Sequence, residues 1–140
     1  AFAGNTAGAE LARALVAADE TALAALGLTK TKVKALRALA GGFMTSQLTS
    51  EALNPLTDAE ILARLDDLPG VGPWTAHMVM IFGLNRPDVF PVDDFGVKKA
   101  AEALYGSVEK ARELSEAWKP YRTAATWLLW RSRTQTPVQY

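Results

Sequence analysis

The sequence predicts an all-α protein, on three observations. Apolar residues make up 49% of the 140 residues, with heavy use of alanine, which is the best helix former. Apolar side chains recur at i, i+3 and i+4 spacing in several stretches, as on the buried face of an amphipathic helix. Residues that cap helices stand just before these stretches, and glycines or prolines stand near their ends.

The first third of the chain predicts three helices. Residues 1–8 are mostly small and predict a disordered or frayed end. A helical stripe starts near Ala9, and Asp19 and Thr29 are candidate N-caps for the next two helices. The third helix is expected to end at Gly41-Gly42.

The middle of the chain predicts two helices joined by a tight turn. Thr57 and Glu60 have the spacing of a capping box, which begins the first of these helices. The second helix runs from about Pro73 to Gly83. It has almost no polar face, so we expect it to be buried. This helical hairpin, residues 57–84, lies within a single predicted domain of residues 9–135, and residues 136–140 are predicted to form a tail.

The turn of the hairpin contains Gly70-Val71-Gly72 followed by Pro73. Two glycines in this spacing let the backbone turn sharply and approach another molecule closely. Pro73 suits the first turn of a helix, whose exposed N–H groups and dipole attract anions. The hairpin is therefore a candidate site for a DNA phosphate. A glycine that merely ends a helix would produce the same pattern.

An acidic pair, Asp93-Asp94, directly precedes a further apolar pattern that is expected to end near Gly106. One of the two is expected to be the N-cap of this helix, and only one can occupy that position. The other would lie near the helix N-terminus, where the dipole favours a negative charge. Capping alone explains the pair, and a catalytic carboxylate is the alternative.

The C-terminal part predicts two more helices. One runs from about Val108 to Trp118, and Pro120 is expected in the first turn of the last one. Trp127 and Trp130 lie on the same face of that last helix, and a tryptophan pair at this spacing is usually part of a core.

Composition and charge exclude several classes of protein. The chain has no cysteine, which rules out disulfides, thiolate catalysis and cysteine-bound iron–sulfur clusters. No apolar run is as long as a membrane span, so no membrane association is expected. The formal net charge is zero, which argues mildly against DNA binding by bulk electrostatics but not against a phosphate grip by backbone amides.

Three segments together resemble the helix-hairpin-helix DNA glycosylases, and among them the bacterial 3-methyladenine-DNA glycosylase II branch. They are Leu68-Pro69-Gly70-Val71-Gly72-Pro73-Trp74-Thr75-Ala76, Asp88-Val89-Phe90-Pro91-Val92-Asp93-Asp94, and Trp118-Lys119-Pro120-Tyr121-Arg122 with Trp130. The resemblance covers roughly residues 15 to 133. It implies a helix-hairpin-helix glycosylase fold.

The resemblance also implies roles for single residues. It makes Asp94 the catalytic residue. It places Trp130 in the pocket that receives the damaged base, while Trp127 is expected to stay in the core. The other expected pocket residues are Trp74, Met78 and Tyr121. The expected phosphate-binding residues are Gly70, Val71, Gly72 and Thr75.

The activity implied is removal of alkylated purines, such as 3-methyladenine and 7-methylguanine, from double-stranded DNA in base excision repair. Relatives that also cut the backbone have a lysine where this chain has Trp74, so a monofunctional glycosylase without lyase activity is expected. No metal or other cofactor is expected, apart from a monovalent cation at the hairpin backbone as in relatives. The protein is expected to be a monomer in the bacterial cytoplasm, associated with the nucleoid through its substrate.

Two other classes of function stay open, and one family element is missing. The chain could be a non-catalytic helix-hairpin-helix DNA-binding module or a helical protein-interaction domain. Relatives carry an upstream helix that packs on the core and supplies a wedge into the duplex. Nothing similar precedes Ala9, so the N-terminal part of the family pattern is expected to be absent.

Overall fold

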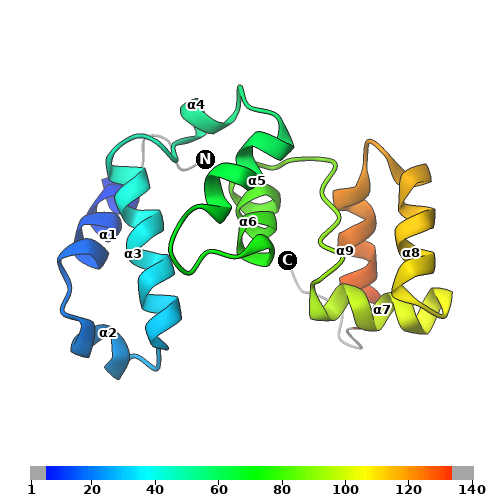
Figure 1. Cartoon of the computed structure of the whole chain (residues 1–140), viewed down its shortest axis with the longest axis horizontal. Helices are drawn as coiled ribbons and strands as arrows, with labels where there is room; N and C mark the ends of the chain where they lie inside the picture. Colours follow the sequence, from blue (N-terminus) through cyan, green and yellow to red (C-terminus); the bar gives the residue numbers. More distant parts are fainter. Residues whose placement is uncertain (1–5, 134–140) are drawn as a thin grey trace. The chain divides into compact units, whose positions relative to one another are not determined.

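The computed structural model describes residues 6–133, and within that range the chain forms helices, turns and loops without strands (Figure 1). The predicted all-α class is confirmed. The chain divides into two compact units, whose boundary in the sequence falls between Val79 and Met80. The single domain predicted for residues 9–135 stays a prediction, and the predicted tail, 136–140, lies outside the described residues.

Within the described residues 6–79, the first unit contains six helices. They are α1 (Thr6–Ala17), α2 (Glu20–Ala25), α3 (Lys30–Met44), α4 (Ser50–Leu53), α5 (Asp58–Asp66) and α6 (Pro73–Met78). α1 and α2 pack against α3, and α5 packs against α6 to form the helical hairpin (Figure 1). The side chains of Leu53, Ile61 and Leu65 are fully buried.

Asp19 lies at the N-cap position of α2 as expected, but its side chain makes no capping hydrogen bond. The expected caps at Thr29 and Thr57 are confirmed. The Thr29 side chain accepts a hydrogen bond from the backbone N–H of Lys32 at the start of α3. At the start of α5, the N–H of Glu60 donates to Thr57 Oγ1, and the N–H of Thr57 donates to the Glu60 carboxylate at 2.7 Å. This reciprocal pair is the predicted capping box, and it satisfies two N–H groups that the helix cannot pair internally.

Two predicted helix boundaries in this unit are wrong. α1 begins at Thr6 rather than near Ala9, and residues 1–5 lie outside the described range. α3 does not end at Gly41-Gly42 but continues to Met44. Gly42 is buried, and a Cβ there would overlap the side chain of Leu48. The glycine therefore serves close packing inside the helix rather than helix termination.

The second hairpin helix also differs from the prediction. It is α-helical only over Pro73–Met78 and continues as a π-helical turn, η1 (Val79–Gly83), across the boundary between the units. Ala76 and Met80 are buried, but Trp74 and Phe82 are half-exposed, so the expectation of a fully buried helix is wrong.

The second unit contains α7 (Phe95–Tyr105), α8 (Val108–Ser115), a 3-10 turn η2 (Glu116–Trp118) and α9 (Arg122–Ser132). α7 packs against both α8 and α9 and lies across their ends in Figure 1. The core joins Val97 and Ala100 of α7 to Leu129 of α9. Phe90, Trp118 and Trp130 pack around these three residues.

The helix limits in this unit follow the sequence closely. α7 ends at Gly106, which adopts a left-handed conformation with φ +85°, as glycine does after many helices. Ser107 then caps α8 by accepting a hydrogen bond from the N–H of Lys110. Two limits differ. The helix expected from Val108 to Trp118 is α-helical only as far as Ser115 and continues as the 3-10 turn η2. Pro120 was expected inside the first turn of the last helix but lies two residues before α9 begins at Arg122.

Candidate active site

The Asp94 carboxylate is the N-cap of α7. Its Oδ1 accepts a hydrogen bond of 2.9 Å from the backbone N–H of Val97, and the residue is only 9% exposed. The side chain of Asp93 is 72% exposed and forms an ion pair of 3.0 Å with Lys98. The sequence left open which aspartate caps the helix. The structure assigns the cap to the same residue that the family pattern makes catalytic.

Trp130, in the last turn of α9, reaches the same carboxylate. Its indole Nε1 donates a hydrogen bond of 2.7 Å to Asp94 Oδ1. One oxygen of Asp94 is therefore held by two donors, one from α7 and one from α9. A buried carboxylate needs such donors, because removing its charge from water is costly unless hydrogen bonds replace the lost hydration.

Gly96 provides the space that this contact needs. A Cβ at position 96 would lie 2.9 Å from Cδ1 of Trp130 and 3.1 Å from Oδ1 of Asp94. The first of these distances is shorter than real Cβ contacts, so the indole would have to move. Residue 96 thus has to be small for Trp130 to lie directly beside Asp94.

Phe82 and Trp127 complete an aromatic cluster around Trp130. The Phe82 ring stacks on Trp130 with centroids 5.9 Å apart and an interplanar angle of 7°. Trp127 packs edge-on against Phe82 at 5.5 Å and against Trp130 at 5.6 Å. Trp127 is 46% exposed, so its expected place in the core is wrong. α9 instead buries Thr126 and Leu129.

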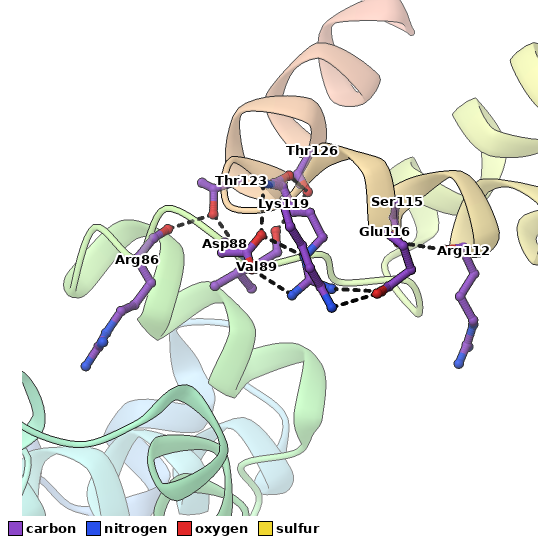
Figure 2. A network of polar contacts seen from close by, with 10 residues as sticks. Arg86, Asp88, Val89, Arg112, Ser115, Glu116, Lys119, Thr123 and Thr126 are labelled. Carbon is purple, nitrogen blue, oxygen red and sulfur yellow. Dashed lines mark hydrogen bonds and ion pairs between the residues drawn. The ribbon is translucent and has the colours of Figure 1, made fainter.

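A polar network fixes the segment that leads to Asp94 (Figure 2). Asp88 accepts three hydrogen bonds from Arg122, namely from the backbone N–H at 3.2 Å, from Nε at 2.7 Å and from Nη2 at 2.9 Å. These hydrogen bonds hold the pKa of the Asp88 carboxyl below its ordinary value. Asp88 therefore caps α9 from a distance of 34 residues in sequence.

Two threonines of α9 continue this network. Thr123 Oγ1 donates to the carbonyl of Arg86 at 2.6 Å and accepts from the N–H of Val89 at 2.9 Å. Thr126 is fully buried, and its Oγ1 donates to the carbonyl of Val89. The segment 86–89 is thus bound to α9 through backbone and side-chain groups (Figure 2). Residues 90–93 connect this anchored segment to Asp94.

The hairpin turn, in the other unit, has the backbone that the sequence predicts. Gly70 has φ +80°, and a Cβ there would lie 2.8 Å from the carbonyl oxygen of Thr31 in α3. Gly72 is extended and is the N-cap of α6, with nothing within 4 Å of a Cβ position. Gly70 is therefore required by both conformation and packing, whereas Gly72 leaves open space in front of the helix.

The structure unites some predicted site residues and separates others. Asp94 and Trp130 are in contact within the second unit. Tyr121 is 68% exposed at the N-cap of α9. It precedes Trp130 by nine residues, which is about 13 Å along a helix. Gly70, Val71, Gly72, Trp74, Thr75 and Met78 all belong to the first unit.

Residues 6–133 contain neither a cluster of metal-binding side chains nor a helix that could span a membrane. In this part of the chain there is no group of three or more His, Cys, Asp or Glu side chains suited to hold a metal ion. None of the helices described is long and apolar enough to span a membrane.

The chain matches a known protein family. A family model described as "HhH-GPD superfamily base excision DNA repair protein" matches residues 6–122. The chain belongs to the HhH-GPD superfamily. The match includes both the hairpin and Asp94, so the resemblance drawn from the sequence motifs is confirmed.

Several members of the HhH-GPD superfamily are similar to the chain. DNA-3-methyladenine glycosylase 1 of Schizosaccharomyces pombe is 32% identical over 81% of this chain and 53% of its own length. DNA-3-methyladenine glycosylase 2 of Escherichia coli is 31% identical over 88% of this chain and 42% of its own length. The chain thus spans about half the length of the curated relatives it matches, such as the first of these.

Solved structures give the same family assignment. The structure of the S. pombe 3-methyladenine DNA glycosylase in complex with abasic DNA matches with a TM-score of 0.79 and 28% identity. The match covers 91% of this chain and 66% of that one. A DNA-3-methyladenine glycosidase from Bacillus halodurans matches with a TM-score of 0.73 and 29% identity, over 89% of this chain and 59% of that one. The predicted helix-hairpin-helix fold is confirmed.

Three features of this HhH-GPD chain escaped prediction from sequence. Gly96 carries no signal of its own, because a glycine early in a helix has many uses. The Asp88–Arg122 pair joins residues 34 positions apart, and only their shared presence in the family segments pointed to them. Phe82 would have faced elsewhere in a regular α-helix, and nothing in the sequence indicated the π-helical turn.

Proposed function

We propose that this chain is a monofunctional DNA glycosylase that hydrolyses the N-glycosidic bond of alkylated purines, such as 3-methyladenine and 7-methylguanine. The observation that carries the proposal is the buried Asp94 carboxylate, held by two donors next to an aromatic cluster. Mere DNA binding needs no such carboxylate. The relatives' names support the same activity.

The proposed reaction breaks the bond between C1′ of the sugar and the purine nitrogen. The bonding electron pair leaves with the base, and positive charge develops on the sugar. A fixed carboxylate beside the sugar stabilises this charge more in the transition state than in the ground state. The oxygen of a water molecule then bonds to C1′, and Asp94 is the candidate to orient that water or accept its proton. The products are the free base and an abasic site.

Alkylation at a ring nitrogen gives the purine a positive charge, so it leaves as a neutral molecule without acid assistance. A cationic base also stacks favourably on electron-rich rings. Trp130 stands next to Asp94 and is the proposed stacking partner. Trp74 and Met78, both in the first unit, stay candidates for contact with the base. We leave Tyr121 out of this pocket, because it lies at the opposite end of α9 from Trp130.

We assign the hairpin to the DNA backbone. In this proposal Gly70, Val71, Gly72 and Thr75 bind a phosphate through the turn and the start of α6, where Gly72 leaves the approach open. The zero net charge fits a grip made by backbone N–H groups rather than by a basic surface. We also propose that the backbone of the hairpin turn binds a monovalent cation.

We also propose that the protein acts on double-stranded DNA as a monomer, because Asp94 and Trp130 come from one chain. We further propose that it has no lyase activity. Trp74 stands where lyases of the superfamily have a lysine, and an indole cannot form a Schiff base with the sugar.

The test measures base release from alkylated duplex DNA by the wild type and by Asp94→Asn, together with binding of both to a duplex with an abasic site. Asparagine retains an oxygen that accepts the hydrogen bonds from Val97 and Trp130, so the fold is preserved while the charge is lost. We expect release to vanish in the variant and binding to persist. Binding by both proteins without release by either would make the chain a DNA-binding module, and absence of binding would contradict any role on DNA.

A further inference from the structure

We propose that Trp130 and Gly96 are positioning residues that fix the Asp94 carboxylate for the reaction. This rests on the proposed function, but it assigns Trp130 a second task besides stacking on a base. The indole N–H holds one carboxylate oxygen, and Gly96 is the residue that allows the indole to come close enough to do so.

The geometry of Asp94 is the first argument. Both the N–H of Val97 and the indole of Trp130 donate to Oδ1, at 2.9 and 2.7 Å. The cap restrains Oδ1 from α7. The Trp130 donor, on another helix, further restricts rotation of the carboxylate and thereby the direction of Oδ2. A carboxylate that stabilises a developing charge gains from being held in place before the reaction begins.

The space at Gly96 is the second argument. Alanine is normally better than glycine inside a helix by about 1 kcal/mol. At position 96, however, a Cβ would lie 2.9 Å from Cδ1 and 3.3 Å from Nε1 of Trp130. Glycine at position 96 therefore lowers helix stability relative to alanine, but it allows the indole of Trp130 to contact Asp94. Gly41 in α3 is the contrasting case, since nothing lies within 4 Å of its Cβ position.

The neighbouring tryptophan provides a matched control. Trp127 lies on the same helix, packs against the same Phe82 ring and touches Trp130 edge-on. The indole of Trp130 donates to Asp94. Replacing either tryptophan by phenylalanine retains an aromatic ring and removes an indole N–H. Trp127→Phe therefore controls for a general loss of ring area in the cluster. Gly96→Ala retains the Trp130 indole and disturbs its contact with Asp94, which separates the hydrogen bond from loss of the indole itself.

The experiment compares the full chain with four variants, Trp130→Phe, Gly96→Ala, Trp127→Phe and Gly41→Ala. Single-turnover base release from alkylated duplex DNA is measured at saturating protein, and binding to an abasic-site duplex is measured in parallel. We expect Trp130→Phe and Gly96→Ala to slow release roughly tenfold to a hundredfold, the usual effect of losing a hydrogen bond to a charged group. Their binding to the abasic-site duplex, and both release and binding by the other two variants, should change less than about threefold, on the scale of ordinary surface substitutions.

A double variant tests whether Gly96 acts through Trp130. If it does, Gly96→Ala added to Trp130→Phe slows release no further, because the contact that the alanine would displace is already lost. If the two substitutions acted independently, their effects on the rate of base release would multiply. That result would overturn the inference that Gly96 acts through Trp130.

A spectroscopic readout checks the contact directly. The four tryptophans give four indole N–H signals in a ¹⁵N-labelled sample. The signal missing in Trp130→Phe identifies Trp130, and we expect this signal to move in Gly96→Ala but not in Gly41→Ala. An unmoved signal would overturn the proposal, as would release by Trp130→Phe at the wild-type rate. Absence of release by the wild type itself would contradict the proposed function instead, while the signal would still report on the contact.

Discussion

The ion pair between Asp88 and Arg122 offers a strong test of how the second unit is held together. We consider Asp88→Ala, which removes the partner of three hydrogen bonds from Arg122. The backbone bond caps α9, and loss of a cap costs about 1 kcal/mol. The two guanidinium bonds form a fork between side chains that are each 23% exposed, and their loss adds about 1–2 kcal/mol. The total expected loss is about 2–3 kcal/mol at neutral pH.

The sign of the pH dependence follows from the lowered pKa of Asp88. A carboxyl whose folded pKa lies below its unfolded pKa stabilises the protein fully above the unfolded value. That contribution is lost as the pH falls through the folded value. The wild type should therefore lose its advantage over Asp88→Ala on acidification below about pH 4, where the aspartate of the unfolded chain is mostly protonated while the folded one is still charged.

The assay is urea denaturation at a series of pH values, followed by tryptophan fluorescence. Asp93→Asn is the control, because its ion pair with Lys98 is largely exposed and should contribute less than about 0.5 kcal/mol. A difference between wild type and Asp88→Ala that stays constant from pH 7 to pH 3 would show that the charge of Asp88 is irrelevant. If the two proteins had the same free energy of unfolding at pH 7, the expected loss of about 2–3 kcal/mol would be refuted.

Substitutions in the first unit give further expectations, each measured as the change in the midpoint of urea denaturation. Thr57→Ala removes the cap of α5 and should cost about 1 kcal/mol, while Thr57→Ser should restore most of it. Gly70→Ala should cost about 2 kcal/mol or more, because the left-handed backbone is strained and Thr31 blocks the Cβ. Gly41→Ala should stabilise α3 by about 0.5–1 kcal/mol, and a loss would mean that its surroundings are tighter than they are in the structure.

Sequence reasoning succeeded where structure depends on neighbours along the chain. The capping box of Thr57 and Glu60, the cap at Thr29 and the end of α7 at Gly106 all involve groups within four residues of each other. Such contacts form whenever the helix forms, whatever surrounds it. The hairpin turn was predictable for the same reason, since the φ of Gly70 is a local property.

The failures arose where distant parts of the chain decide the outcome. α3 runs through Gly41-Gly42 because Leu48 packs against Gly42, and no local pattern reports that contact. The exposure of Trp127 follows from which face of α9 meets α7. The bond between Trp130 and Asp94 spans 36 residues. The family pattern put both residues in the site but did not indicate that one would hold the other.

The π-helical turn at Val79–Gly83 has a consequence for the length of the chain itself. A π-helix closes its hydrogen bonds over five residues rather than four, so it holds one residue more than the same turn of an α-helix. Deleting a single residue before Phe82 would therefore let the turn relax to a regular helix while Phe82 kept its place. Rewinding the turn to an α-helix at its present length would instead rotate every later side chain by about 100°. Phe82 would then leave Trp130, so their contact depends on the extra residue being held in the π-helical turn.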